Sequence, residues 1–425
     1  MMFPETTTTQ TPLQPEVRNA LVDAAASLFA RGGVRGATAR AIGTAATAPV
    51  SAINYYFGSK EALLIEAARQ TQRADAAWLE EEARQVRALE TEPALLSDWF
   101  AALCLHRAVA RRDSTLIAAD TALQAARSDA FADIARDWDT ATTGFFAEVM
   151  PLFGISQEKA SMFADFFTAV PLMVPSASGT ATSAWVISTA RYLAGTAQGR
   201  WHDAAPWRER IERMASAADK QRADRGAVPD TPTAQRILDG ATRVLIRDGA
   251  AALTHRAISE EAGVALSATT RLFDGRDAIL RATFERIYLG FVREIEEQRP
   301  ALPPASQSMD DFVESMSEPL DRADGQIRPE LTAMEETFLA ARRDPELSGL
   351  MLHLAATRGT TSAGLMASLK SPRAPTRTDA FLMSICAFGM MRSLRCAPPE
   401  RRRTISRERL RARLAVLFSE EPGAV

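Results

Sequence analysis

The chain has 425 residues, of which 46% are hydrophobic and 24% charged, and its net charge is −3. This length exceeds one typical domain, and the composition is that of a globular protein. Because the three cysteines and four histidines show no paired ligand spacing, we expect no metal, no cofactor and a reducing, cytoplasmic setting. No apolar run approaches the ~20 residues of a membrane helix, so we expect no membrane partner.

The first expected element is a polar, threonine-rich stretch, residues 1–14, which we interpret as a disordered tail. Pro15 suits the first turn of a helix, and the apolar residues after it are spaced by three and four. Gly32 and Gly33 are expected to end this helix as a left-handed cap. Thr38 is a suitable N-cap for a second, short helix.

A tight turn over residues 46–49 follows the second helix. Pro49 is expected to start a third helix that runs through Tyr56, and Ser59 to cap a long fourth helix from Lys60. Two short helices joined by a tight turn form a helix-turn-helix, whose second helix can enter the major groove of DNA. We therefore predict a first DNA-binding head over residues 15–63.

The next segment, residues 64–215, is expected to form long amphipathic helices, and we name it the first body. Residues 216–232 are polar and end in turn formers, which predicts a linker. Arg107, Arg111 and Arg112 in the first body either neutralise an acidic effector or form a solvated helix face. We regard the solvated face as the better interpretation.

An internal repeat organises the rest of the chain. Thr38 aligns with Thr254 and Phe57 with Phe273, at an offset of 216 residues and without a gap. Further on, Ala-Ala-Arg-Ser-Asp at 125–129 aligns with Ala-Ala-Arg-Arg-Asp at 340–344, at an offset of 215. A period of this length is one whole domain, not a solenoid repeat. The prediction is an all-α protein of two tandem units, with a second head over 233–279 and a second body over 280–420.

The head residues resemble the DNA-binding domain of TetR-type (TetR/AcrR-like) regulators. The resemblance lies in Thr38-Ala-Arg-Ala-Ile42 and in Val50-Ser-Ala-Ile-Asn-Tyr-Tyr-Phe57-Gly-Ser-Lys60-Glu-Ala-Leu63. Thr47, Pro49 and Asn54 depart from the family pattern, which has glycine, serine and tyrosine there. These departures leave the fold unchanged but put the base preference in doubt. The resemblance implies helical bodies that dimerise and bind a small effector.

Family position implies the DNA contacts. In the first head, Ser51, Ala52, Asn54 and Tyr55 would face the groove, and Thr38, Arg40, Tyr56 and Lys60 would lie at the backbone. Asn54 is suited to adenine and Tyr55 to a thymine methyl. In the second head the expected groove residues are Ser267, Ala268, Thr270 and Arg271, and the expected backbone residues are Thr254, His255 and Arg276. For each, an ordinary surface residue is the alternative.

Charge distinguishes the heads. The second head has acidic residues where the first has few, so the first should bind phosphates more strongly.

Two clusters of methionine and aromatic residues mark either effector cavities for an apolar or aromatic molecule or plain helix core, and we favour core. The clusters are Met162, Phe163, Phe166, Phe167, Met173 and Trp185, and then Phe338, Met351, Phe381, Met383, Phe388, Met390 and Met391.

The predicted function is a repressor of transcription that binds a double-stranded DNA operator and is released by a small-molecule effector. Because the two heads differ, an intramolecular pseudo-dimer would recognise an asymmetric operator. Three alternatives stay open within this class: a further homodimer of whole chains, a second head that does not read DNA, and activation in place of repression. From other classes, the alternatives are a helical scaffold that does not bind DNA and an all-α enzyme.

Overall fold

The computed structural model describes residues 15–125, 128–174, 179–200, 209–210, 212–216, 231–298, 305–317 and 327–418. The expected tail and most of the expected linker lie outside these residues. Within them the chain is mainly helical, with an isolated β-bridge between Gln307 and Leu369. None of the described helices is long and apolar enough to cross a membrane.

The first head contains three helices before the long helix that begins the body. They are α1 (Pro15–Gly36), α2 (Ala39–Ala45) and α3 (Val50–Phe57). The first body then comprises α4 (Lys60–Ala88), α5 (Leu96–Val109), α6 (Arg112–Gln124), α7 (Asp129–Val149), α8 (Gln157–Ala169) and α9 (Thr180–Ala197).

The second head repeats this order with α11 (Pro232–Asp248), α12 (His255–Ala262) and α13 (Leu266–Leu272). The second body comprises α14 (Arg276–Gln298), α15 (Met309–Ser317), α16 (Pro329–Arg343), α17 (Ser348–Thr357), α18 (Thr360–Met366), α19 (Arg377–Cys396) and α20 (Pro399–Leu417). Short 3-10 turns join several helices, at Pro93–Leu95, Met150–Phe153, Val170–Met173, Ala250–Ala252 and Pro345–Leu347.

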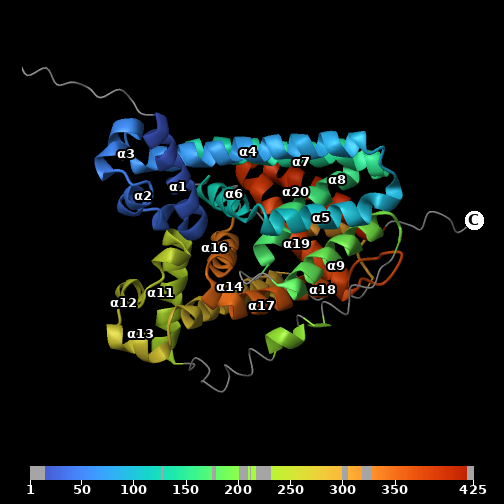
Figure 1. Cartoon of the computed structure of the whole chain (residues 1–425). Coiled ribbons are helices and arrows are strands. Elements are labelled where there is room, and N and C mark those ends of the chain that lie inside the picture. The colour runs from blue at the N-terminus through green and yellow to red at the C-terminus, as the bar shows by residue number, and fades with distance from the viewer. Residues whose placement is uncertain are drawn as a thin grey trace, which may run out of the picture.

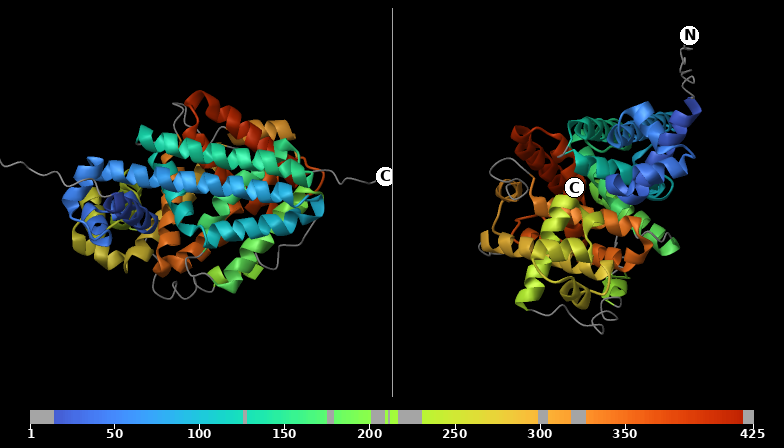
Figure 2. Two further views of the ribbon diagram at one scale, coloured as in Figure 1. Left: turned by 45° about the horizontal axis from the view of Figure 1, so that its top comes forward. Right: turned by 90° about the vertical axis from the view of Figure 1, so that its left-hand side faces the viewer.

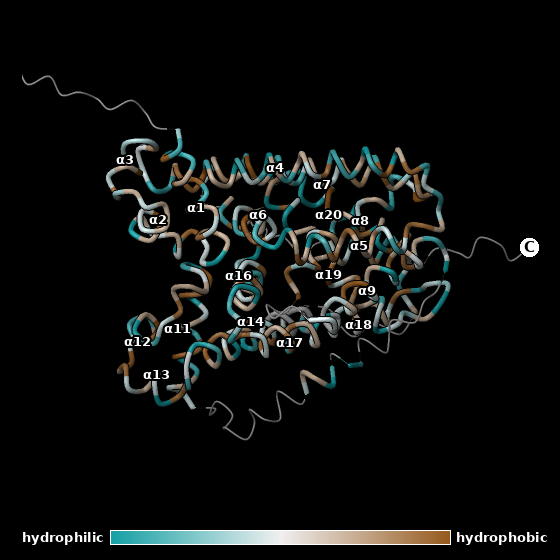
Figure 3. The backbone as a smooth tube through the Cα atoms, viewed as in Figure 1, coloured by the Kyte–Doolittle hydropathy of each residue, from teal (hydrophilic) through white to brown (hydrophobic). Residues whose placement is uncertain are grey.

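The two heads lie at the same end of the molecule (Figure 1). The long helices α4 and α7 run side by side away from the first head, as the left view of Figure 2 shows. Hydrophilic and hydrophobic residues alternate along α4 (Figure 3), as expected for a helix with one buried face. The heads therefore project from a common helical base.

The hydrophobic core of the first head extends into the first body. Leu21, Phe29 and Ile42 are fully buried, and Phe131 and Trp138 of α7 pack in the same cluster. The head is thus held against α7 by apolar burial, the main favourable term in folding. The three cysteines are buried and unpaired, and they pack as small apolar core residues.

One boundary differs from the sequence-based expectation. Gly33 has φ 68° and ψ −174°, so it interrupts α1 with a kink, but the chain is helical again as far as Gly36. The short extra turn brings Ala37 into the core and leads directly to Thr38. Glycine is needed at this kink because a side chain is strained at such a backbone angle.

Candidate DNA-binding surfaces and body cavity

The first helix-turn-helix is positioned by caps and by two buried isoleucines. The Thr38 hydroxyl accepts a hydrogen bond from the Ala41 amide at 3.2 Å and so begins α2, as predicted. Ile42 of α2 and Ile53 of α3 are buried against the rest of the head. This burial turns the opposite face of α3 toward solvent, which is the arrangement that a DNA-reading helix requires.

The residues expected to face DNA in the first head divide into two groups by exposure. Thr38, Arg40, Ser51, Asn54 and Tyr55 are exposed, whereas Ala52, Tyr56 and Lys60 are half-buried. The Tyr55 side chain is 60% exposed, although its ring packs edge-on against Tyr56 with the centroids 5.0 Å apart. Five of the eight candidates are therefore accessible from solvent.

Lys60 has a structural contact besides its expected place at the DNA backbone. Its Nζ donates to the Val34 carbonyl at 3.1 Å, which ties the start of α4 to the extra turn of α1. An ammonium has three donors, so this bond leaves capacity for a phosphate. Ser59 caps α4 through a hydrogen bond from the Ala62 amide at 3.0 Å, as expected.

The second head repeats the geometry. Thr254 caps α12 by accepting from the Ala257 amide at 3.2 Å. Ser267, Thr270, Arg271 and Arg276 are exposed, and His255 is half-buried. The Thr270 hydroxyl lies 3.3 Å from the Leu266 and Ser267 carbonyls of its own helix, which restrains it as a reader of bases. Arg271 remains the longest exposed side chain among the candidates of α13.

Several arginines of the second head pair with acidic neighbours. Arg256 pairs with Glu260 at 2.9 Å on the exposed face of α12. In the first head the aligned residues are Arg40 and Thr44, so this ion pair has no counterpart there. Arg276, expected at the DNA backbone, lies 3.4 Å from Asp344 at the end of α16. Because these carboxylates compete with phosphate, the second head is the weaker electrostatic surface.

A groove of about 700 Å³ separates the heads, and charged contacts cross between the units nearby. Arg35 of the first head pairs with Asp248 of the second at 2.9 Å. Arg343, the last residue of α16, donates to the Ala30 carbonyl at 3.0 Å and pairs with Asp120 of α6 at 2.6 Å. In the sequence, Arg343 stands out only as part of the repeated Ala-Ala-Arg pattern, and nothing in that pattern predicts these contacts.

The geometry of both heads is that of a helix-turn-helix DNA-binding protein. Residues 21–67 and 237–283 each match the family model described as bacterial regulatory proteins, tetR family. The chain therefore carries two tetR-family DNA-binding domains in tandem, and regulators of this family bind DNA and are not enzymes. Among curated proteins, none matches the chain.

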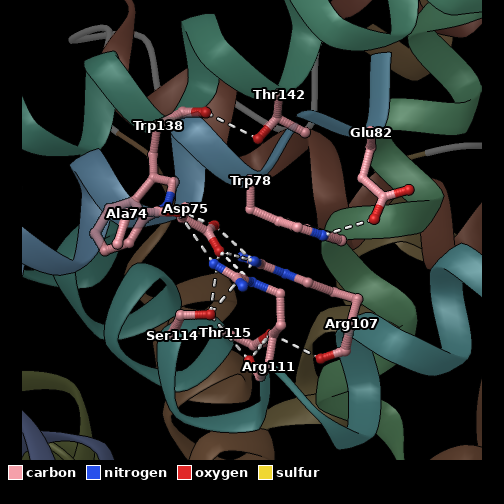
Figure 4. A network of polar contacts seen from close by, with 10 residues as sticks. All are labelled: Ala74, Asp75, Trp78, Glu82, Arg107, Arg111, Ser114, Thr115, Trp138 and Thr142. Atoms are coloured by element: carbon pink, nitrogen blue, oxygen red, sulfur yellow. Dashed lines mark hydrogen bonds and ion pairs between the residues drawn. The ribbon is translucent and has the colours of Figure 1, made fainter. Parts of the chain in front are cut away.

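The interior of the first body contains a buried ion network (Figure 4). Asp75 of α4 accepts from Arg107 at 2.5 Å, from Arg111 at 3.1 Å and from the Trp138 indole at 2.9 Å. Burial by itself would raise the pKa of Asp75, but Arg107, Trp138 and Arg111 together hold it below its ordinary value. The interpretation of Arg107 as part of a solvated face was therefore wrong: it is 3% exposed and faces a carboxylate.

Both methionine and aromatic clusters are buried, and those of the first body pack in its core. The second body holds a cavity of about 150 Å³, bounded by residues of α14, α15, α16, α17, α18 and α19. Phe338, Phe388 and Met391 from the expected cluster line this cavity. The cavity has a charged group in its wall, Arg358, whose pKa burial lowers to about 10, so it remains protonated at neutral pH.

Proposed function

We propose that this regulator is a repressor whose two units act as an intramolecular pseudo-dimer on an asymmetric operator. The observation that carries the proposal is the packing of α8 of the first body against α19 and α20 of the second. One polypeptide thereby holds two unlike reading helices, α3 and α13, on a common base. A second chain is not needed to supply the second head.

The helix crossing between the units is close. A Cβ atom placed on Gly389 of α19 would lie 1.9 Å from the Asp165 carbonyl oxygen of α8, so only glycine fits there. The Asp165 carboxylate is buried and accepts from Arg409 and Arg413 of α20, at 3.1 Å each. A buried charge triad costs free energy if it is broken, which favours one fixed arrangement of the units.

Release by a small effector is supported by the position of α16. Leu331, Met334 and Phe338 of this helix line the cavity of the second body. At its C-terminal end, Arg343 contacts Ala30 of the first head. A molecule that binds more tightly when α16 is shifted would displace this contact and change the spacing of the heads. The difference between the affinities of this molecule for the shifted and unshifted positions of α16 sets the free energy available to release the operator.

The experiment is selection from random duplex DNA with the full chain, beside the variants Tyr55→Ala and Arg271→Ala. We expect a site with two unlike halves, one half relaxed by each variant, because base contacts specify sequence. The complex at this site should contain one chain per duplex. An apolar or aromatic compound that releases the operator would establish the repressor mechanism.

Other outcomes would decide between the alternatives. A palindromic site bound by two chains would show that whole chains pair through their first heads. If Arg271→Ala changes neither affinity nor preference, the second head is not a reader. No enrichment at low salt would contradict DNA recognition and favour the helical scaffold, since a DNA-binding protein loses affinity steeply only as salt rises.

A further inference from the structure

The cavity of the second body has an apolar lining and one basic group. Its walls include Phe284, Leu354, Phe338, Phe388 and Met391. A cavity of about 150 Å³ lined by such side chains is large enough to take up a benzene ring. The size and lining therefore fit a single aromatic ring with small substituents.

Arg358 is placed in this cavity by the break between α17 and α18. Its guanidinium carbon lies 4.8 Å from the ring centroids of both Phe338 and Phe388, and Nη1 lies 3.4 Å from the Ser384 hydroxyl. The next residue, Gly359, has φ 85°, and a Cβ there would lie 2.7 Å from the Phe381 amide nitrogen. The turn is thus pressed against α19, which fixes the start of the arginine side chain.

The charges around the cavity favour an anion. Glu335 also lines the cavity, but it forms an ion pair with Arg395, which lies outside the cavity wall. Arg358 is the basic group among the residues that line the cavity. A guanidinium binds a carboxylate through two parallel hydrogen bonds. This interaction is stronger where water is excluded.

The first body is built differently at the equivalent place. At the offset of 215, Thr143 and Gly144 align with Arg358 and Gly359, and both lie within the continuous helix α7. The Thr143 hydroxyl donates to the Asp139 carbonyl of the same helix at 2.8 Å. The charged side chains of the first interior, Asp75 and Arg107, are already paired with each other. The two bodies thus align at this position, but only the second body has a basic residue, Arg358, there.

We propose that the second body binds one small aromatic carboxylate per chain, with its ring among the phenylalanines and its carboxylate on Arg358. The identification of this molecule as the effector rests on the proposed function, whereas the binding site itself does not. Phe388 and Met391 belong to α19, the helix that packs on the first unit, so an occupant would contact the interface between the units.

The test is isothermal titration calorimetry of the full chain without DNA, using benzoate, benzyl alcohol and benzylamine as probes. These share a ring and differ in charge. We expect benzoate to bind with one site per chain and at least about tenfold more tightly than benzyl alcohol, because an ion-assisted hydrogen bond is worth at least that factor. Arg358→Gln should reduce benzoate to the level of benzyl alcohol.

Two further variants keep the result interpretable. Leu365→Phe fills the cavity and should abolish binding of both benzoate and benzyl alcohol, even if Arg358→Gln fails to fold. Thr143→Val, at the aligned position of the first body, should change nothing. Equal affinity for the three probes, preference for benzylamine, two sites per chain, or no binding at millimolar concentration would each overturn the proposal. Benzoate binding that leaves operator affinity unchanged would contradict the effector mechanism and leave the site intact.

Discussion

Arg35 at the end of α1 pairs with Asp248 at the end of α11, with Nη2 and Oδ1 2.9 Å apart, and so joins the two heads directly. Both side chains are partly exposed, at 53% and 27%, so the pair contributes about 0 to 1 kcal/mol to stability. The importance of this ion pair is that it lies between the two heads. It crosses the groove between the heads and restrains the distance between α3 and α13.

The first prediction concerns this inter-head pair. Arg35→Ala should leave the thermal midpoint nearly unchanged but make operator binding more tolerant of one added or removed base pair between the half-sites. Band shifts with such spacer variants would measure this. Arg31→Ala is the matched control, because Arg31 bonds only to Ser27 of its own helix among the described residues. An unaltered spacer profile in Arg35→Ala would contradict the restraint.

Thr47, in the turn between α2 and α3, provides a second prediction. It has φ 52°, a left-handed angle that is costly for a β-branched residue, and Gly263 at the aligned position has φ 62°. Thr47→Gly should stabilise the first head by about 1 kcal/mol, and Gly263→Ala should destabilise the second by a similar amount. Hydrogen exchange of the amides in each head would measure both changes. Faster exchange in Thr47→Gly would contradict the strain argument.

A third prediction addresses the crossing of α8 and α19. Gly389→Ala places a methyl group against the Asp165 backbone and should destabilise the chain by about 1 to 3 kcal/mol, since the helices must separate. Gly144→Ala is the control: nothing lies within 4 Å of its Cβ position, and alanine in a helix interior should stabilise by roughly 0.5 to 1 kcal/mol. Thermal unfolding would compare the two. Equal midpoints for both variants would show that the crossing is looser than described.

The sequence predicted the heads well because local chemistry decides their structure. Thr38, Ser59 and Thr254 cap the helices that their positions indicated, and the constant offset revealed the second head. The kink at Gly33 was not predicted, because whether helix resumes after a glycine depends on packing beyond it. Of the expected site residues, those on the outer face of α3 are exposed as the helical period implies.

Contacts between helices that are distant in the sequence could not be predicted from local patterns. Arg107 and Arg358 are ordinary arginines in the sequence, and their partners come from other helices. Glu260 and Glu261 carried a usable signal, because they occupy positions that are Thr44 and Ala45 in the first head. That comparison predicted weaker phosphate binding by the second head, and the ion pairs of Glu260 and Glu261 give a physical reason for it.

Asp75 provides a prediction about pH. Its pKa is held below the ordinary value in the folded protein, so its contribution to stability is present above about pH 4 and is lost as the pH falls through the lower folded pKa. Asp75→Asn leaves Arg107 buried without a carboxylate and should cost about 3 to 5 kcal/mol at neutral pH. The difference in thermal midpoint between the two proteins should shrink below pH 4. A constant difference across this range would contradict the assignment.

The last prediction compares how Arg40 of the first head and the aligned Arg256 of the second contribute to the salt dependence of DNA binding. Arg40 is exposed, and the structure pairs it with no other described residue, whereas the aligned Arg256 is held by Glu260. Each phosphate contact releases counterions, so Arg40→Ala should reduce the slope of log affinity against log salt by about 1. Arg256→Ala should change the slope less, because its charge is already partly neutralised. Glu260→Gln frees Arg256 and should steepen the slope. If Arg256→Ala matches Arg40→Ala, the two heads contact the backbone equally and the ion pair opens on DNA.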